Sequence, residues 1–105
     1  MSHYIVSFTI GQKESYNSIW NSLKEVIDQI SIDVPTDETT SFFAFESNMN
    51  TGDVVHKLYY DSQLLSGTDK LLVVNITANE HGYLGIEYPY LMGGALGTRL
   101  VKAID

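Results

Sequence analysis

Three histidines and one acidic neighbour are the side chains of this chain that could take part in acid–base chemistry. His81 directly follows Glu80, and such a pair could move a proton. His3 and His56 lie far from this pair in the sequence, and the three histidines lack the spacing of a metal site. Because Glu80 and His81 stand in a polar stretch, Asn-Glu-His-Gly, we interpret them as part of a solvated turn.

Three other groups of residues have types that could bind a ligand or react. Residues 93–98, Gly-Gly-Ala-Leu-Gly-Thr, are glycine-rich like a phosphate-binding loop, but they lack its lysine and its strand-to-helix context. Residues 33–38 are acidic, but their carboxylates lack the alternating spacing of a calcium loop. Ser7 and Thr9 lie near Lys13 without a placed base, which is typical of structural hydroxyls. The sequence therefore predicts no catalytic residue, no cofactor and no metal site.

Composition narrows the classes of partner. The chain has 105 residues, a formal net charge of −7 and no cysteine. The negative charge disfavours binding to nucleic acid on its own and to anionic membranes, because both need lysine and arginine. The missing cysteines exclude disulfides and thiolate metal sites, and they suit a cytoplasmic protein. The chain also lacks the patterns of a signal peptide and of a membrane helix, so we expect no membrane contact.

The elements that must position these residues follow from the spacing of apolar side chains. Residues 4–10, Tyr-Ile-Val-Ser-Phe-Thr-Ile, are β-prone and alternate between two faces, which predicts a central strand. A first helix is predicted by apolar residues at a spacing of three and four: Tyr16, Ile19, Trp20, Leu23, Val26, Ile27 and Ile30. A second helix is predicted over residues 51–64, with Asn50 as its cap and Asp53 in its first turn.

Three further strands complete the expected fold. Residues 31–34 predict a short edge strand, which Pro35 stops. Residues 41–47 predict a strand that is apolar on both faces, and residues 70–77 predict the last strand. With right-handed crossovers, the order βαββαβ predicts an α+β, ferredoxin-like domain over residues 1–78. Its sheet would be four-stranded and antiparallel, with the first and third strands central and both helices on one face.

Residues 79–105 form a C-terminal extension of unusual composition. Residues 83–92 are apolar and aromatic, while Pro89 and the glycine pair that follows argue against a helix. We therefore expect an extended tail that packs on the sheet of its own chain or of a partner, with residues 83–92 added to a sheet edge. Residues 98–104 fit a short strand and a last helical turn equally well.

The face of the sheet opposite the helices is expected to be apolar. Assigning the even-numbered residues of the last strand to the helices leaves Leu71 and Val73 on this open face beside Ile5. An apolar face of this size needs a cover, which the extension, a second protomer or both could supply. We therefore expect a homodimer with these interface residues: Ile5, Ser7, Thr9, Leu71, Val73, Tyr83, Ile86, Tyr88 and Tyr90.

Three segments resemble one known family. Residues 4–10, residues 42–45 (Phe-Phe-Ala-Phe) and residues 69–74 (Asp-Lys-Leu-Leu-Val-Val) are similar to three strands of the small CRISPR-associated subunit of the spacer-acquisition complex. The relatives of that family include VapD-type ribonuclease toxins and SinR-like proteins. The resemblance covers residues 4–77 and implies a ferredoxin-like fold and a dimer. In catalytic members an aspartate near the end of the first strand binds the metal, and Thr9 stands at that position here.

Thr9 cannot supply the charge that holds a divalent metal ion. The resemblance therefore implies the fold and the dimer more than nuclease activity, and the sequence favours a protein without enzymatic activity. The function that we expect is a non-catalytic homodimeric scaffold or adaptor, which another protein could bind. Two alternatives stay open: a regulatory domain that binds a small ligand at the dimer seam, and a metal-dependent nuclease relative.

Overall fold

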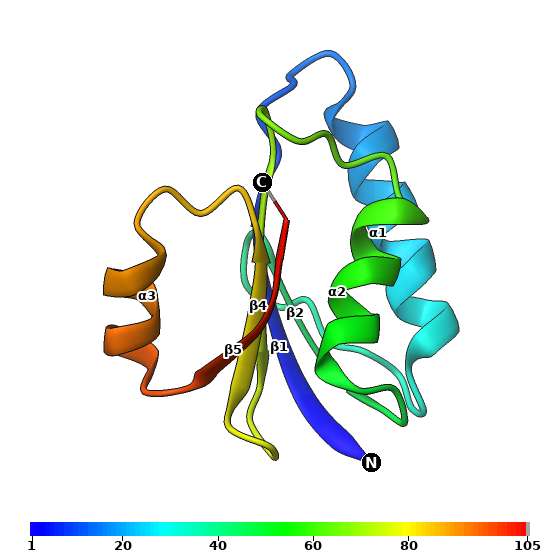
Figure 1. Cartoon of the computed structure of the whole chain (residues 1–105). Coiled ribbons are helices and arrows are strands. Elements are labelled where there is room, and N and C mark those ends of the chain that lie inside the picture. Colours follow the sequence, from blue (N-terminus) through cyan, green and yellow to red (C-terminus); the bar gives the residue numbers. More distant parts are fainter. Residues whose placement is uncertain (105) are drawn as a thin grey trace.

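A five-stranded sheet with helices on both faces forms the frame of the protein. The computed structural model describes residues 1–104. The elements are β1 (Ser2–Thr9), α1 (Tyr16–Ile30), β2 (Phe42–Ser47), α2 (Thr51–Tyr60), β3 (Lys70–Asn75), β4 (Glu80–Leu84), α3 (Pro89–Leu96) and β5 (Arg99–Ile104). The strands lie in the order β2-β1-β3-β4-β5, and only the β4–β5 pair is parallel. Helices α1 and α2 cover one face of the sheet, and α3 lies on the other (Figure 1).

The protein is thus an α+β protein, but the prediction of a four-stranded antiparallel, ferredoxin-like sheet is wrong. The sheet is mixed and larger, because β4 and β5 extend it beyond β3. Residues 31–34 form no strand. The Ile32 N–H donates to the Glu46 carbonyl and Thr36 forms an isolated bridge with Ala44, so this segment follows β2 through single contacts. Pro35, which has no N–H, lies between these two contacts. The expectation that residues 41–47 form a central strand is wrong, because β2 lies at the edge of the sheet and β3 lies inside it.

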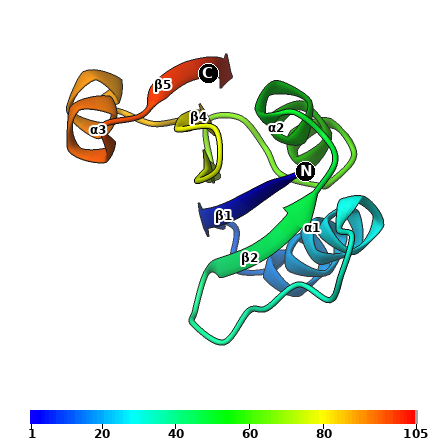
Figure 2. The same ribbon diagram turned by 90° about the horizontal axis from the view of Figure 1, so that it is seen from below.

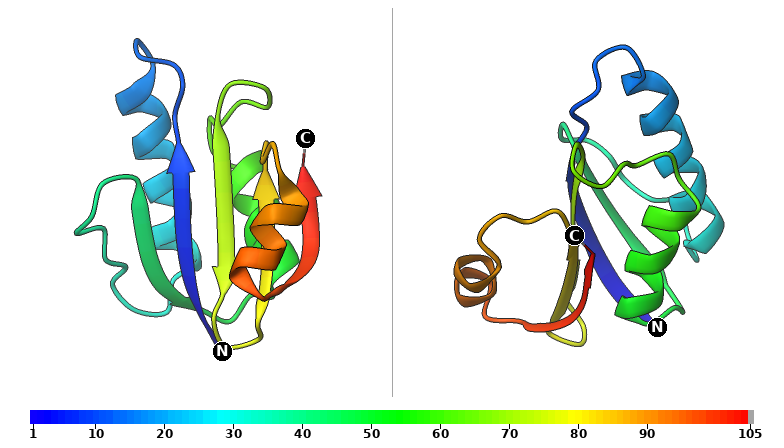
Figure 3. Two further views of the ribbon diagram at one scale, coloured as in Figure 1. Left: turned by 90° about the vertical axis from the view of Figure 1, so that its left-hand side faces the viewer. Right: turned by 45° about the horizontal axis from the view of Figure 1, so that its top comes forward.

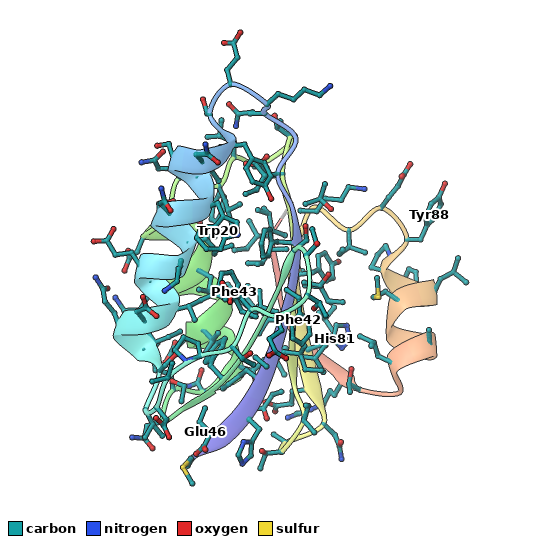
Figure 4. The ribbon with its side chains drawn as sticks, turned by 180° about the vertical axis from the view of Figure 1, so that it is seen from behind. Trp20, Phe42, Phe43, Glu46, His81 and Tyr88 are labelled. Atoms are coloured by element: carbon teal, nitrogen blue, oxygen red, sulfur yellow. The ribbon has the colours of Figure 1, made fainter. Side chains whose placement is uncertain are left out.

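Helices α1 and α2 form at the predicted places, but α2 ends at Tyr60 and not at residue 64. The stripe of α1 has the expected phase, since Ile19 and Leu23 are buried beneath it and Trp20 is partly buried. The Trp20 ring centroid lies 5.7 Å from that of Phe43 on the sheet (Figure 4). The cap of α2 is confirmed, because the Asn50 side chain accepts a hydrogen bond from the helix. In residues 1–104, no helix has the length and apolarity needed to cross a membrane.

The register of the sheet decides which side chains face α1 and α2. Tyr4, Val6 and Phe8 of β1 are buried on this side. Val6 lies opposite Val73 in the antiparallel β1–β3 pair, and Phe8 lies opposite Leu71. Directly opposite residues of an antiparallel ladder share a face. Leu71 and Val73 therefore belong to the core, where both are fully buried.

Helix α3 corrects the expectation that residues 83–92 are extended throughout. Pro89 occupies the first helical turn, where a missing N–H leaves no helical hydrogen bond unmade. Gly97 ends the helix with φ 68°, a left-handed conformation that glycine adopts without strain. Of residues 83–92, only Tyr83 and Leu84 add to a sheet edge, as the end of β4, which pairs with β3 of its own chain. Residues 99–104 then form β5 beside β4.

Candidate interaction face and its pocket

The face of the sheet opposite α1 and α2 is only half covered. Helix α3 lies over its β4–β5 side, and β1 and β2 carry no helix on this face (Figures 2 and 3). Strand pairing places the side chains of the uncovered half in rows that run across β2, β1 and β3. One row is Phe42, Ser7 and Leu72, and the next is Ala44, Ile5 and Val74.

Helix α3 itself exposes apolar side chains. None of its eight residues is buried and none is charged. The exposed fraction is 94% for Tyr90 and 72% for Leu91. A helix that is apolar on all sides is normally buried, and a large exposed apolar patch marks a site of interaction. We use the name α3 face for the surface that consists of the outer side of α3 (Tyr90 and Leu91) and the two rows of sheet residues described above.

The β1 and β3 residues of the expected interface separate into two groups. Ile5, Ser7 and Thr9 lie on the open side of β1, as the alternation of this strand predicts. Leu71 and Val73 lie on the opposite side and are completely buried under α1 and α2, so the expectation that they line an interface is wrong. Their places on the open side of β3 belong to its even-numbered residues.

The expected interface residues of the extension lie around α3. Tyr83 of β4 faces α3 and is 7% exposed, because it pairs with Leu72 on the open side of the sheet. Ile86 is partly buried in the loop before α3. Tyr88 and Tyr90 are exposed, and Tyr88 points away from the sheet (Figure 4). The structure thus brings these residues beside Ile5 on one face of the molecule.

A pocket of about 400 Å³ separates α3 from the β4–β5 side of the sheet. His81 lies in its wall and is only 2% exposed, and its ring points from the sheet toward α3 (Figure 4). Its Nδ1 lies 2.8 Å from the hydroxyl oxygen of Thr98. Burial lowers the pKa of His81, and a hydrogen bond to the Thr98 backbone opposes this by a smaller amount. The full lining is His81, Tyr83, Pro89, Tyr90, Gly93, Gly94, Thr98 and Leu100.

His81 and Glu80 are therefore not a solvated turn, and they do not form an acid–base pair. They are successive residues of β4, so their side chains point to opposite faces of the sheet. The turn lies one step earlier, at residues 76–79, where Asn79 has φ 56°. The sequence signal that could have located His81 is the alternation of His81 and Tyr83 after this turn. The other two histidines are exposed, and the ring of His56 lies 4.4 Å from that of Tyr60.

Glu80 belongs to a polar cluster that joins β4 and β5 to the start of α2. The Thr51 hydroxyl donates to Glu80 Oε1 at 2.7 Å, and Asn75 Nδ2 donates to Thr51 Oγ1 at 3.0 Å. Arg99 forms an ion pair with the other Glu80 oxygen. The hydrogen bond from Thr51 is the main cause that lowers the pKa of Glu80, and Arg99 lowers it further. These groups bond to one another, so the cluster stabilises the fold and offers no free reactive group.

Thr9 lies at the end of β1, opposite Lys70 of β3. The neighbouring carboxylate, Asp69, is buried and accepts hydrogen bonds from the backbone N–H groups of Gly11 at 2.8 Å and Leu65 at 2.9 Å. Asp69 therefore fixes two loops together. Within the part of the chain that the structure describes, no group of three or more histidine and acidic side chains could hold a metal ion.

No family model matches the chain, and no curated protein or solved structure matches it significantly. What the protein does must be inferred from its own contacts, burial and charge.

Proposed function

We propose that the protein is a non-catalytic homodimeric scaffold whose two copies meet through their α3 faces. The observation that carries this proposal is α3, an uncharged helix with no buried side chain. Tyr90 and Leu91 project from it into solvent, and Ile5 and Leu72 on the same face of the sheet are only partly buried. An apolar helix beside an apolar sheet surface forms a patch to which a partner protein could bind.

A second copy is the partner that fits this face. Helix α3 covers one half of the open face, and a two-fold axis would place the α3 of each copy over the uncovered β1–β2 half of the other. The interface would then be self-complementary, with apolar helix against apolar sheet in both directions. Charge supports the same arrangement, because residues 88–98 contain no charged side chain in a chain of net charge −7. Copies that meet there keep their negative charges apart.

The energies involved are of the size that association requires. Burying a large, fully exposed apolar side chain stabilises by about 1.5–3 kcal/mol. Tyr90 and Leu91 are exposed and would each contribute twice in a two-fold dimer, while the half-buried Leu72 and Val74 would add less. The gain is of the same order as an association cost of about 4–15 kcal/mol.

Light scattering and sedimentation velocity over a range of concentrations test the proposal. We expect the wild-type chain to be a dimer and Leu91→Glu to be a monomer, because the new carboxylate would be buried against apolar side chains. Leu65→Glu is the matched control, since Leu65 is 50% exposed and lies in the α2–β3 loop, away from the α3 face. A monomeric wild type, or a Leu91→Glu variant as dimeric as the control, contradicts the proposal.

The proposal includes kinship with the small CRISPR-associated subunit and a cytoplasmic location. Residues 4–10, 42–45 and 69–74 support the kinship, and the missing cysteines support the location. The exposed Thr9 opposite Lys70 supports a member without catalysis. We expect no cleavage of RNA or DNA in magnesium or manganese. Cleavage that persists through repurification and stops when EDTA is added would contradict a non-catalytic role.

A further inference from the structure

The pocket between α3 and β4 has a feature that the scaffold function does not use. His81 is almost completely buried, yet one side of its ring faces open space rather than a packed side chain. A Cβ atom placed on Gly93 of α3 would lie 3.6 Å from His81 Cε1 and 3.9 Å from Nε2. Gly93 brings no side chain to this contact, and together with Gly94 and His81 it lines the pocket.

The two ring nitrogens of His81 have different surroundings. Nδ1 bonds to Thr98, which fixes the orientation of the ring. No hydrogen bond to Nε2 is found within residues 1–104, although the residue is 2% exposed. Because burial lowers the pKa of His81, the ring is neutral near pH 7, and in either tautomer Nε2 offers one hydrogen-bonding group. Within residues 1–104, Gln12 Nε2 is the only buried side-chain nitrogen or oxygen without a hydrogen bond, so His81 Nε2 still reaches the pocket, where a ligand group could bond to it.

We propose that this pocket binds a neutral, mostly apolar small molecule that carries a flat ring and a single hydrogen-bonding group for His81 Nε2. The lining contains no charged side chain, so a charged ligand would lose its hydration without compensation. Tyr83 supplies apolar ring surface, and a volume of about 400 Å³ suits a small molecule of two or three rings. The two glycines of α3 give a flat wall against which a ring can lie.

A fluorescence titration with N-phenyl-1-naphthylamine tests the proposal on the full chain. This probe is neutral, has fused and single aromatic rings with one N–H group, and gains fluorescence in apolar surroundings. We expect saturable binding of one probe per chain. His81→Phe keeps the shape of the ring but removes Nε2, and it should weaken binding about 2- to 12-fold, the net effect of one hydrogen bond.

Two variants of Gly93 test the location. Gly93→Leu should fill the space above His81 and weaken probe binding by about 10-fold or more, because a packed pocket has no room for the probe. Gly93→Ala places its Cβ at ordinary contact distance from the imidazole, so it keeps the fold and should weaken binding to a smaller extent. Gly52→Leu is the matched control, since Gly52 lies in α2 on the other face of the sheet. Circular dichroism and thermal melting of each variant confirm that it is folded.

A last comparison separates the pocket from the dimer interface. Leu91→Glu should still bind one probe per chain, because Leu91 is outside the lining of the pocket. Probe binding that never saturates, or that is equally tight in Gly93→Leu and wild type, overturns the pocket proposal. Loss of binding in Leu91→Glu with retention in Gly93→Leu also overturns it, by placing the probe at the outer side of α3. Light scattering on the same samples reports the dimer independently.

Discussion

The hydroxyl oxygen of Thr98 lies 2.8 Å from Nδ1 of His81, and this contact joins the end of the α3 crossover to the strand beneath it. The backbone of His81 pairs with Leu100 in the β4–β5 ladder, so both the backbone and the ring of His81 contact the segment that follows α3. Burial lowers the pKa of this histidine, because the charged form would lose its hydration. The folded protein therefore holds His81 in its neutral form, whereas the unfolded chain titrates it normally.

This difference predicts that acid destabilises the protein through His81. The pKa in the unfolded chain is near the reference value of 6.5, and the pKa in the folded state is lower, so the unfolded state binds more protons in the window below 6.5. The stabilising contribution is fully present above that pH and is lost as the pH falls toward the folded pKa. Urea unfolding at pH 7.5 and pH 5.5 should show the loss in wild type and less of it in His81→Phe. Equal slopes in wild type and His81→Phe would contradict the prediction.

Val73 and Val74 are adjacent in β3 but face opposite sides of the sheet, which gives a second prediction. Val73→Thr places a hydroxyl in the core beside Val6 and should lower the free energy of unfolding by about 1–3 kcal/mol. Val74→Thr places the same hydroxyl on the open face and should change it by less than about 0.5 kcal/mol in a monomeric Leu91→Glu background. Denaturant unfolding of both variants decides it. If Val74→Thr were the more damaging change, the register of β3 against β1 would be wrong.

The same pair shows how far the sequence could predict the fold. The alternation of β1, the stripe of α1 and the Asn50 cap are local patterns, and each predicts its element correctly. Residues 70–77 are apolar on both faces, so alternation cannot say which side of β3 faces the helices. That choice follows from pairing with β1, a contact between residues far apart in the sequence. The prediction that Leu71 and Val73 lie on the open face is wrong for this reason.

The extension was harder to predict because its local signals conflict with its tertiary contacts. Pro89 and the following glycines disfavour a helix interior, but Pro89 stands at the helix start, where it is favoured. For residues 31–34 the conflict is reversed. Their side chains favour a strand, but the segment makes only single contacts with β2 and forms no continuous ladder with it. The pocket around His81 depends on α3 standing over β4. No local pattern in the sequence places Gly93 above His81.

The polar cluster around Thr51 gives a third prediction. Thr51 is 1% exposed, and its hydroxyl both donates to Glu80 and accepts from Asn75. Thr51→Val keeps the shape of the side chain but leaves both partners with unmade hydrogen bonds. It should lower the free energy of unfolding by about 1–3 kcal/mol. Arg99→Gln, which removes only the exposed end of the ion pair with Glu80, should cost about 0–1 kcal/mol. Chemical denaturation of the two variants under the same conditions checks the difference, and equal costs would contradict a buried structural role for Thr51.

The last prediction concerns Gly82, where β4 packs closely against Val55 of α2. A Cβ atom at this position would lie 2.5 Å from Val55 Cγ2 and 2.9 Å from the backbone oxygen of Lys102. The β4–β5 register also shifts between His81 and Gly82. Moving β4 away from α2 at this point would therefore break backbone hydrogen bonds between β4 and β5. Gly82→Ala should therefore destabilise the protein by about 1–3 kcal/mol, as overpacking of a core does.

Gly52→Ala is the matched control for this change. A Cβ atom on Gly52 would meet only Asn50 Oδ1, at 3.7 Å, which is an ordinary contact. Because alanine is the better helix former, Gly52→Ala should leave stability unchanged or raise it by up to about 1 kcal/mol. Thermal melting of both variants separates the close approach of β4 and α2 from a general effect of replacing glycine. A Gly82→Ala variant as stable as wild type would show that β4 does not pack against α2 at the distance described, and the placement of the whole extension would have to be revised.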